Sequence, residues 1–369
     1  MKTALIHEWL VTNAGAESVL QSIYKLFPGD IHALFHDPDG LRGTLWENAD
    51  VTTSMLQRLP FGRKRYRAYL PLFPMAVEQF DLRDYKLILS SSYAVAKGVL
   101  NSSDQLHICY CHSPMRYIWD LTFEYLEAAQ IERGLKSFLV RLVFHYMRMW
   151  DQISAARVNH FVANSYYIAH RIQKCYNREA TVIYPPVDIH RFHVSRHKDD
   201  YFITISRLVQ YKRIDLIVKA FNELGLRLLI IGDGPARDRL KAIAQKNIEF
   251  LGYVSSPAIE EYLSKARAFI FSAEEDFGIV NVEAQAAGVP VVAFGRGGAL
   301  ETVIENETGL FFWKQSPQAI IDAMRQFLVN EHKFDPAYIR QNAESFPRER
   351  FELEFKRFVD FAWEDFPYK

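Results

Sequence analysis

The chain is poor in cysteine and has no long apolar run. Three cysteines in 369 residues are too few and odd in number for a disulfide framework, which favours a reducing compartment. No apolar stretch approaches the ~20 residues needed to span a bilayer, and the N-terminal MKTALIHEWL lacks the apolar segment of a signal peptide. We therefore expect a cytoplasmic protein whose contact with a membrane, if it has one, is peripheral.

A net charge is also absent, because 44 Lys and Arg balance 44 Asp and Glu. An extended nucleic-acid surface is therefore not indicated. The balance breaks locally in QRLPFGRKRYR, residues 57–67, which contains basic residues and no acid. With 49% apolar and 24% charged residues, the remainder has the composition of a globular protein.

Cys109, Cys111 and His112 lie close enough in sequence to suggest a metal site. No second Cys or His pair follows at zinc-site spacing, and on a strand the two cysteines point to one face. Core packing is the better interpretation, and we expect no metal.

Short apolar runs alternate with amphipathic stretches, which is typical of parallel sheets covered by helices. In the first half the runs TALIH, IHALFH, KLILSSS, LHICYCH and HFVANS predict strands, residues 16–27 predict a helix, and residues 133–157 predict a longer helix packed on the sheet. TVIYPPVD closes this half, and residues 188–200 read as a linker. YFITIS, RLLIIG, AFIFSA and PVVAF predict strands of a second half, with helices at 214–224, 258–266 and 279–288.

Two such halves predict two Rossmann-like domains facing across a cleft. We expect an N-terminal domain of residues 1–187 and a C-terminal domain of residues 188–349. Residues 350–369 predict an amphipathic terminal helix that returns to the N-terminal domain.

Two cations follow the first predicted strand of the second half. Arg207 and Lys212 stand in ISRLVQYKRID, at the carboxyl end of a strand, where open α/β sheets bind ligands. They would suit a diphosphate, although a solvated loop explains them equally well. IGDGP, residues 231–235, supplies glycines for a strand-to-helix turn.

The stretch EEDFGIVNVEA, residues 274–284, places two carboxylates eight positions apart. Glu275 falls on the exit loop of AFIFSA, Gly278 permits close approach of the backbone, and the helix that starts there offers free N–H groups. Favourable charge at a helix N-terminus explains Glu275 and Asp276, but it does not explain Glu283 among apolar residues. Two carboxylates at this spacing could hold the hydroxyls of two separate sugars.

Taken in order, Arg207, Lys212, IGDGP, FLGYVS and the pair Glu275 and Glu283 resemble the retaining, nucleotide-sugar-dependent glycosyltransferases of the GT-B fold, glycosyltransferase family 4. The similarity covers nearly the whole chain and is strongest over 201–310. HEWLVTNAGAE and CHSPMRYIWD are similar to a narrower branch, the O-antigen mannosyltransferases that use GDP-mannose.

The resemblance assigns roles to single residues. Glu283 would bind the donor ribose, Glu275 the transferred hexose, and Arg207 and Lys212 the diphosphate. His112 would sit beside the transferred sugar. Further donor contacts are implied at the amides of Phe277, Gly278 and Ile279, at Gly15 on the N-terminal side, and at Tyr253 and Val254 near the base. Arg116 would reach donor or acceptor.

Three positions depart from the family pattern. This chain has Ala14 before Gly15 where the family often has two glycines, and Ser206 and Arg213 where the family tends to have glycine. Arg213 would add a third cation or face solvent.

The implied activity is transfer of a hexose, mannose from GDP-mannose, to a lipid-linked saccharide during bacterial lipopolysaccharide O-antigen biosynthesis, without a cofactor or metal. Retaining hydrolases need carboxylates ~5 Å apart across one bond, which two glutamates of one domain do not obviously provide. The basic, aromatic segment 56–73 would hold the enzyme peripherally on the inner face of the plasma membrane.

Four alternatives remain at this stage. A UDP-sugar-dependent hexosyltransferase and a nucleotide-sugar epimerase would share the fold. A noncatalytic carbohydrate-binding relative would not need both glutamates together with Arg207 and Lys212. An NAD-dependent oxidoreductase would need a G-x-G-x-x-G after the first strand, where HEWLVTNAGAE has one glycine.

Overall fold

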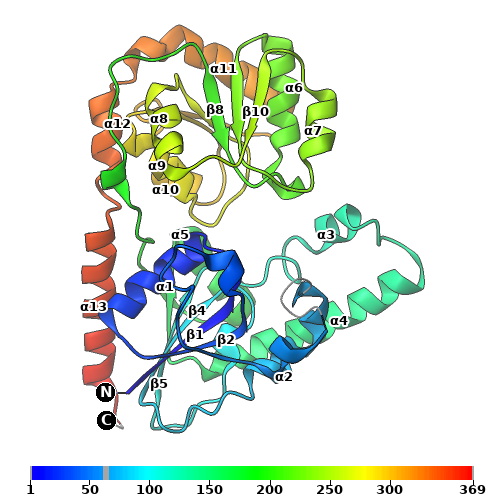
Figure 1. Cartoon of the computed structure of the whole chain (residues 1–369), viewed down its shortest axis with the longest axis vertical. Helices are drawn as coiled ribbons and strands as arrows, with labels where there is room; N and C mark the ends of the chain where they lie inside the picture. Colours follow the sequence, from blue (N-terminus) through cyan, green and yellow to red (C-terminus); the bar gives the residue numbers. More distant parts are fainter. Residues whose placement is uncertain (1, 61–65, 368–369) are drawn as a thin grey trace. The chain divides into compact units, whose positions relative to one another are not determined.

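The computed structural model describes residues 2–60 and 66–367. The chain divides into two compact units, Met1–Pro186 with Phe351–Lys369, and Val187–Arg350. Each unit has its own parallel sheet with helices packed against it, which confirms the two Rossmann-like domains (Figure 1).

The sheet of the first unit has the strand order β3-β2-β1-β4-β5-β6-β7, and the pairing is parallel throughout. Its strands are β1 (Thr3–Leu10), β2 (Asp30–His36), β3 (Val51–Thr53), β4 (Leu87–Ser92), β5 (Leu106–Cys111), β6 (His160–Ala163) and β7 (Ala180–Val182). Its α-helices are α1 (Gly15–Leu26), α2 (Phe73–Val77), α3 (Thr122–Ala128), α4 (Gly134–Ser154) and α5 (Tyr166–Tyr176). Short 3-10 helices are η1 (Pro38–Leu41), η2 (Met55–Arg58), η3 (Tyr66–Leu72), η4 (Ala96–Gly98) and η5 (Ala155–Arg157).

The sheet of the second unit has the order β10-β9-β8-β11-β12-β13, again parallel. Its strands are β8 (Phe202–Ile205), β9 (Leu228–Ile231), β10 (Ile248–Gly252), β11 (Phe269–Phe271), β12 (Val291–Phe294) and β13 (Gly309–Phe312). Its helices are η6 (Ile189–Arg191), η7 (Gln210–Lys212), α6 (Ile214–Leu224), α7 (Arg237–Ile243), α8 (Ser256–Lys265), α9 (Ile279–Ala286), α10 (Ala299–Thr302), α11 (Pro317–Asn330), η8 (Glu331–Lys333) and α12 (Pro336–Ala343).

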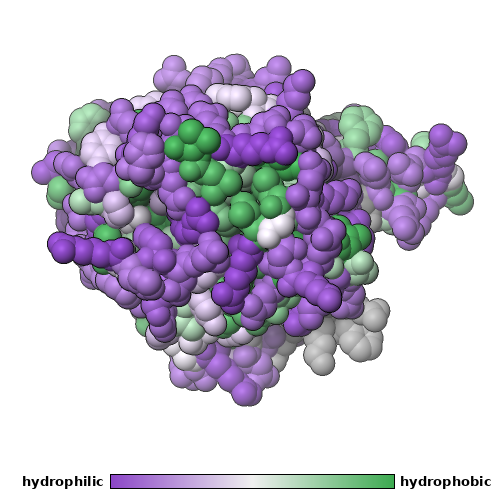
Figure 2. Space-filling model, turned by 90° about the horizontal axis from the view of Figure 1, so that it is seen from above, coloured by the Kyte–Doolittle hydropathy of each residue, from purple (hydrophilic) through white to green (hydrophobic). Residues whose placement is uncertain are grey.

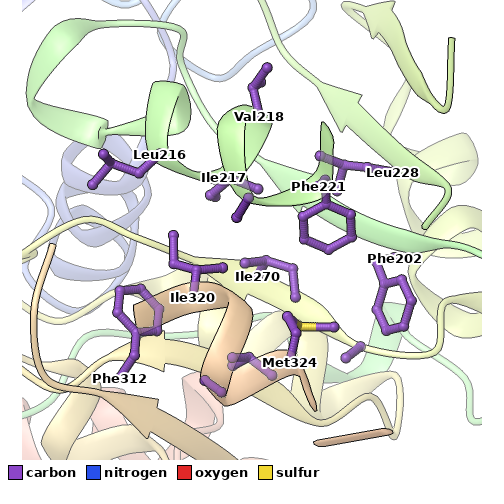
Figure 3. Packing of buried hydrophobic residues seen from close by; sticks show 14 of the residues in the cluster. Phe202, Leu216, Ile217, Val218, Phe221, Leu228, Ile270, Phe312, Ile320 and Met324 are labelled. Atoms are coloured by element: carbon purple, nitrogen blue, oxygen red, sulfur yellow. The ribbon is translucent and has the colours of Figure 1, made fainter. Parts of the chain in front are cut away.

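The core of the second unit follows from the periodicity of its helices. In α6 the buried residues Ile214, Ile217, Val218 and Phe221 recur at helical spacing, so one face of the helix meets the sheet. The buried face of α11 packs beside α6 and against β12 and β13, and Figure 3 shows side chains of both helices around Ile270 of β11. Hydrophilic residues cover most of the face of the molecule in Figure 2, with a smaller group of hydrophobic residues near its middle.

The terminal helix α13 (Arg348–Asp365) packs on the first unit, as predicted. Its buried residues Phe351, Phe355 and Val359 recur every four positions and join the core that contains Leu5 of β1 and Tyr110 of β5. The Tyr110 ring lies 5.6 Å from the Phe351 ring, edge to face. The last helix is therefore part of the first unit although the second unit precedes it in sequence.

The predicted helix at 133–157 is present as α4 and η5, but only part of it packs as expected. Met147, Trp150 and Ser154 are buried, whereas a row of large apolar side chains along α4 is exposed. Cys109 and Cys111 are both buried among apolar residues, so core packing, the interpretation favoured from sequence, is confirmed.

Candidate functional site

The strand order of the second unit creates a switch point between β8 and β11. The chain moves outward from β8 to β9 and β10, and then returns to the other side of β8 with β11. Loops that leave the carboxyl ends of β8 and β11 therefore diverge, and ligands of open α/β sheets bind in the crevice at such a point. Lys212 follows β8 and Glu275 follows β11.

The two loops bring opposite charges together. Lys212 Nζ lies 2.6 Å from Glu275 Oε1, and the two side chains are 18% and 19% exposed. The Ser272 hydroxyl, at the end of β11, donates to the Lys212 carbonyl at 2.8 Å and also lies 3.0 Å from the Arg213 carbonyl. A cation and a carboxylate are thus held half-buried, within reach of a ligand at the strand ends.

The backbone around Glu275 depends on glycines that the sequence analysis did not single out. A Cβ at Gly297 would lie 2.3 Å from the Glu275 carbonyl oxygen, and one at Gly298 would lie 2.3 Å from the Phe277 Cα. The N–H of Gly298 donates to the Glu275 carbonyl at 2.9 Å. The loop after β12 can approach the loop after β11 this closely only because it lacks side chains there.

Gly278 has a positive φ of 82° and serves as the N-cap of α9. A glycine adopts this left-handed conformation without the strain that a side chain would cause. The α9 helix is buried along Ala284, Ala286 and Ala287, as expected for small residues packed on the sheet.

Glu283 lies on α9, at the side of the helix that meets the linker. Arg191 of η6 donates to its Oε1 at 2.8 Å, and Glu260 of α8 lies 4.0 Å from the same guanidinium. Burial raises the pKa of the Glu283 carboxyl above its usual range, while Arg191 opposes that shift.

Arg191 and Asn281 are residues that sequence reasoning missed. Arg191 stands in a segment predicted to be a linker, and no local pattern marks it as a partner of Glu283. Asn281 is fully buried on α9 beside Gly278, and its side-chain amide has no hydrogen-bond partner among the described residues. A buried amide in that state costs free energy, which would need compensation elsewhere.

The other predicted residues of the second unit lie in different environments. Arg207 is exposed after β8, and the described part of the chain offers it no ion pair. The role of Arg213 was left open. Its φ is 54°, and its Nε lies 3.4 Å from Asp215 Oδ1, so Arg213 forms an ion pair at the N-terminus of α6. Tyr253 is 90% exposed after β10 and Val254 is half-buried. Phe277 is buried and Ile279 is half-buried.

In the first unit, His112 follows β5. Its Nε2 lies 2.8 Å from the Ser91 hydroxyl of β4, and its ring meets Tyr110 at 5.1 Å and Tyr93 at 6.0 Å. The Asn164 side chain donates to its carbonyl at 3.0 Å. Burial lowers the pKa of His112 to about 3, so the ring is neutral near pH 7. A neutral imidazole has one nitrogen that donates a hydrogen bond and one that accepts.

Gly15 is the first residue of α1, and the turn before it is fixed by a buried pair. The Ala14 N–H donates to Glu17 at 2.9 Å, and the other carboxylate oxygen of Glu17 lies 3.2 Å from His7 Nε2 on β1. Arg116 is half-buried in the segment between β5 and α3.

Two histidines of the first unit with lowered pKa values predict an acid-sensitive fold. Burial lowers the pKa of His107 to about 3, as it does for His112, whereas an unfolded histidine titrates near 6.5. The unfolded chain therefore binds more protons between these values, and stability falls as pH drops from about 6.5 toward 3 by up to about 1.4 kcal/mol per pH unit for each histidine.

Thermal unfolding midpoints between pH 7.5 and 5 measure this effect. The His107→Gln variant should show a shallower loss than wild type, because glutamine can still reach Ser90, 2.8 Å from the histidine ring, without titrating. The exposed His332→Gln serves as control. A His107 variant whose midpoint follows pH in parallel with wild type would contradict the assignment.

The segment predicted to contact a membrane, 56–73, is only partly described. Phe61, Arg63, Lys64 and Arg65 fall outside the described residues. Leu56 and Phe73 are buried, and Tyr66 packs on Trp9 with ring centroids 5.0 Å apart. Arg58 and Arg67 are exposed, and the Tyr69 hydroxyl donates to the Pro60 carbonyl. Much of the aromatic content of this segment therefore serves the core.

Neither a spanning helix nor a metal cluster is found in the part of the chain that is described. No described helix is both long and apolar enough to cross a bilayer. The described residues also contain no group of three or more His, Cys, Asp or Glu placed to hold a metal ion.

Comparison with known proteins gives a family for each unit. Residues 31–191 match the family described as Glycosyltransferase Family 4, and residues 188–346 match Glycosyl transferases group 1. A GDP-mannose-dependent alpha-(1-6)-phosphatidylinositol monomannoside mannosyltransferase of Mycobacterium tuberculosis is 32% identical over 149 residues. That match covers 36% of this chain and spans about two fifths (39%) of the relative's own length.

Solved structures support the fold over almost the whole chain. Sucrose-phosphate synthase from Thermosynechococcus elongatus superposes with a TM-score of 0.73 at 16% identity, covering 99% of this chain and 100% of the other. HepE from Anabaena in complex with UDP gives a TM-score of 0.70 at 18% identity, covering 98% and 100%. With a Glycosyltransferase Family 4 domain followed by a Glycosyl transferases group 1 domain, this chain belongs to the glycosyltransferases of the GT-B fold.

Proposed function

We propose that this chain is a retaining glycosyltransferase that moves mannose from GDP-mannose to a lipid-linked saccharide in the synthesis of a bacterial cell-surface polysaccharide, with O-antigen as the expected product. The observation that carries the proposal is the pairing of Lys212 with Glu275 at the switch point of the second unit, with Glu283 on the helix that follows. A cation for phosphate and carboxylates for hydroxyls are the groups that a nucleotide sugar requires.

The diphosphate is the leaving group of the proposed reaction. Breaking the bond between the hexose and the diphosphate leaves negative charge on a phosphate oxygen, which Lys212, Arg207 and the N–H groups of Gly278 and Ile279 would stabilise. In the retaining route the acceptor hydroxyl attacks from the face that the diphosphate leaves, and the leaving phosphate oxygen takes the hydroxyl proton. The positive charge comes from side chains, so the proposed chemistry requires no divalent cation.

The two glutamates hold the sugars in this scheme. Glu275, fixed beside Lys212, would accept hydrogen bonds from the transferred hexose. Glu283 would accept from the ribose hydroxyls, and since Arg191 engages its Oε1, we assign a ribose hydroxyl to the other oxygen. His112, neutral and hydrogen-bonded to Ser91, would contact the transferred hexose, and Arg116 donor or acceptor.

Mannose and guanine are favoured by the relatives and not by the geometry. The Mycobacterium tuberculosis relative is named as GDP-mannose-dependent, and its acceptor is a phosphatidylinositol mannoside, itself a lipid-linked sugar. The HepE structure contains UDP, so a UDP-sugar-dependent hexosyltransferase is the second candidate. Transfer to a lipid-linked acceptor would place the enzyme on the inner face of the plasma membrane.

A thermal-shift screen with GDP, UDP and ADP tests the donor. Ligand that binds only the folded state raises the unfolding midpoint with concentration, and GDP at a hundredfold excess over its Kd should add about 2.7 kcal/mol of stability. If only UDP raises the unfolding midpoint, the donor is a UDP-sugar and not GDP-mannose.

Product analysis then tests the reaction itself. Incubation of GDP-mannose with an extracted lipid-linked saccharide fraction should yield a glycolipid heavier by one hexose and free GDP. Conversion of the nucleotide sugar into its epimer without an acceptor would establish an isomerase instead. Retention follows from the anomeric configuration of the new bond by NMR.

A further inference from the structure

The α4 helix carries a row of large apolar side chains that the fold leaves exposed. Their exposed fractions run from 44% to 75%. They are Leu135, Phe138, Leu139, Leu142, Tyr146, Met149 and Ile153. Spacings of three and four residues place them on one side of the helix. We call this row the α4 outer face.

The outer face is not the side by which α4 is attached to its unit. Met147, Trp150, Asp151 and Ser154 are buried on the opposite side. Trp150 donates from Nε1 to Glu78 at 2.8 Å, and Asp151 pairs with the buried Lys97. The helix is thus attached near its C-terminal end by the side that carries Trp150 and Asp151, while its apolar row is exposed.

The charges that border the outer face have one sign. Lys136 flanks the row on one side and Arg141 flanks it on the other, and both are exposed. The one acid of α4 is Asp151, which is buried. The exposed acids nearby in sequence, Glu124, Glu127 and Glu132, precede the helix. The Arg141 guanidinium lies 5.6 Å from the ring of Phe123 on α3. Phe123 is 70% exposed and adds an aromatic side chain beside the outer face.

We propose that the α4 outer face binds the surface of an anionic membrane, with the helix lying in the plane of the headgroups. A helix with an apolar side of Leu, Phe and Tyr and cations along both borders is the pattern of an interfacial helix. The row from 135 to 153 is about 27 Å long at 1.5 Å per residue. Two copies of the chain would meet poorly through this face, because its exposed charges are all positive and offer no complement.

The inference deepens the proposed function, because it names the surface that would bring the site to a lipid-linked acceptor. It also moves the expected membrane contact. The aromatic residues of 56–73 are partly committed to the core, as Tyr66 and Phe73 show, whereas Phe138 and Tyr146 of α4 are exposed. Each cation near an anionic surface should strengthen binding about fivefold.

Vesicle flotation of the full chain tests the surface. Wild type should float with vesicles of phosphatidylcholine containing phosphatidylglycerol and much less with phosphatidylcholine alone. The double variant Phe138→Asp with Leu142→Asp should lose about tenfold or more of its binding to the anionic vesicles. The matched control replaces Val329 and Phe361, which are 74% and 70% exposed on other helices, by aspartate and should bind like wild type.

A second pair of variants tests the charge. Lys136→Gln with Arg141→Gln should lower binding to anionic vesicles about twentyfold at low salt, while Arg325→Gln with Lys246→Gln, both exposed on the second unit, should not. Unchanged flotation of the Phe138 and Leu142 double variant would overturn the proposal. If the wild-type protein is a dimer in solution and that variant is a monomer, the α4 outer face binds a second copy of the chain, which would also overturn the proposal.

The outcome can be separated from that of the proposed function. Thermal shift by the nucleoside diphosphate should be the same for wild type and the α4 variants, because α4 contributes no residue to the donor site. Vesicle binding without any glycosyl transfer would defeat the proposed function and leave the surface standing. If the α4 variants transfer the hexose to a lipid-linked acceptor as fast as wild type and float unchanged, the membrane surface is overturned and the proposed function stands.

Discussion

Replacing Lys212 by alanine is expected to lower kcat/KM for the nucleotide sugar about a hundredfold to a thousandfold, a loss of the size found when one charge-stabilising donor is removed. The ammonium group is half-buried and 2.6 Å from Glu275, at the switch point where the diphosphate would lie. Its removal takes away positive charge where negative charge develops on the leaving group.

Two controls separate this effect from damage to the fold. Lys219→Ala removes an exposed cation from α6, a few residues away, and should leave kcat/KM unchanged. Lys212→Arg should keep part of the activity, because it retains the charge with a different geometry. Steady-state kinetics and thermal midpoints together give the answer. A Lys212→Ala variant that is folded and fully active would remove Lys212 from the proposed site.

A second large effect is expected at Glu283, on binding and not on turnover. Glu283→Ala should weaken the affinity for the nucleoside diphosphate by about tenfold to a hundredfold, the value of one or two hydrogen bonds to a charged group. Glu275→Ala, in contrast, should mainly lower kcat, because Glu275 is assigned to the transferred hexose. Isothermal titration with the nucleotide and kinetics with the nucleotide sugar measure the two quantities separately.

Glu260 provides a matched control for Glu283. Both carboxylates lie near Arg191, at 4.0 Å and 2.8 Å, and both side chains are 22% exposed. If Glu283 only neutralises Arg191, Glu260→Ala and Arg191→Ala should disturb binding in a similar way. If Glu283 holds the ribose, the 2′-deoxy nucleotide should bind more weakly than the ribonucleotide to wild type and equally to Glu283→Ala. A wild type that does not distinguish the two nucleotides would refute the ribose assignment.

The raised pKa of Glu283 adds a pH dependence to the same experiment. Burial makes this carboxyl take up a proton at a higher pH than an ordinary glutamate. Nucleotide affinity should therefore fall on acidification starting above the usual carboxyl range, and Glu283→Gln should flatten that limb. Because the pKa of Glu283 is raised in the folded state, folding stability is lost as pH rises from the pKa of an unfolded glutamate through that of Glu283.

Most helices and central strands were predictable, because their apolar residues recur with a period that the sequence displays. The apolar spacing of Ile214, Ile217 and Phe221 is enough to define α6 from the sequence alone. Three strands were not predicted from the sequence. Strand β10 has the sequence IEFLG with an exposed Glu249, and β3 and β13 are three and four residues long. Short segments of this kind cannot be told from other buried segments by periodicity alone.

The candidate site was predictable at the residues that follow strands. Lys212 and Glu275 could be placed at carboxyl ends of strands, and Gly278 at a turn, from local sequence. The same reasoning could not find Arg191, which reaches Glu283 from 92 positions away. Nor could it identify Gly297 and Gly298 as the glycines that allow the loop at Glu275, because that need arises only from a second loop packed against it.

The sequence by itself determined the α/β class, the division into two units and the residue types available at the strand ends, since these follow from periodicity and composition within short windows. Only the tertiary structure decided which charges meet. Lys212 holds Glu275, Arg191 holds Glu283, and Arg213 is taken by Asp215. It also decided that one side of α4 is buried and the other exposed. Helical periodicity shows that a helix has apolar sides, but which side finds a partner depends on the order in which strands and helices pack.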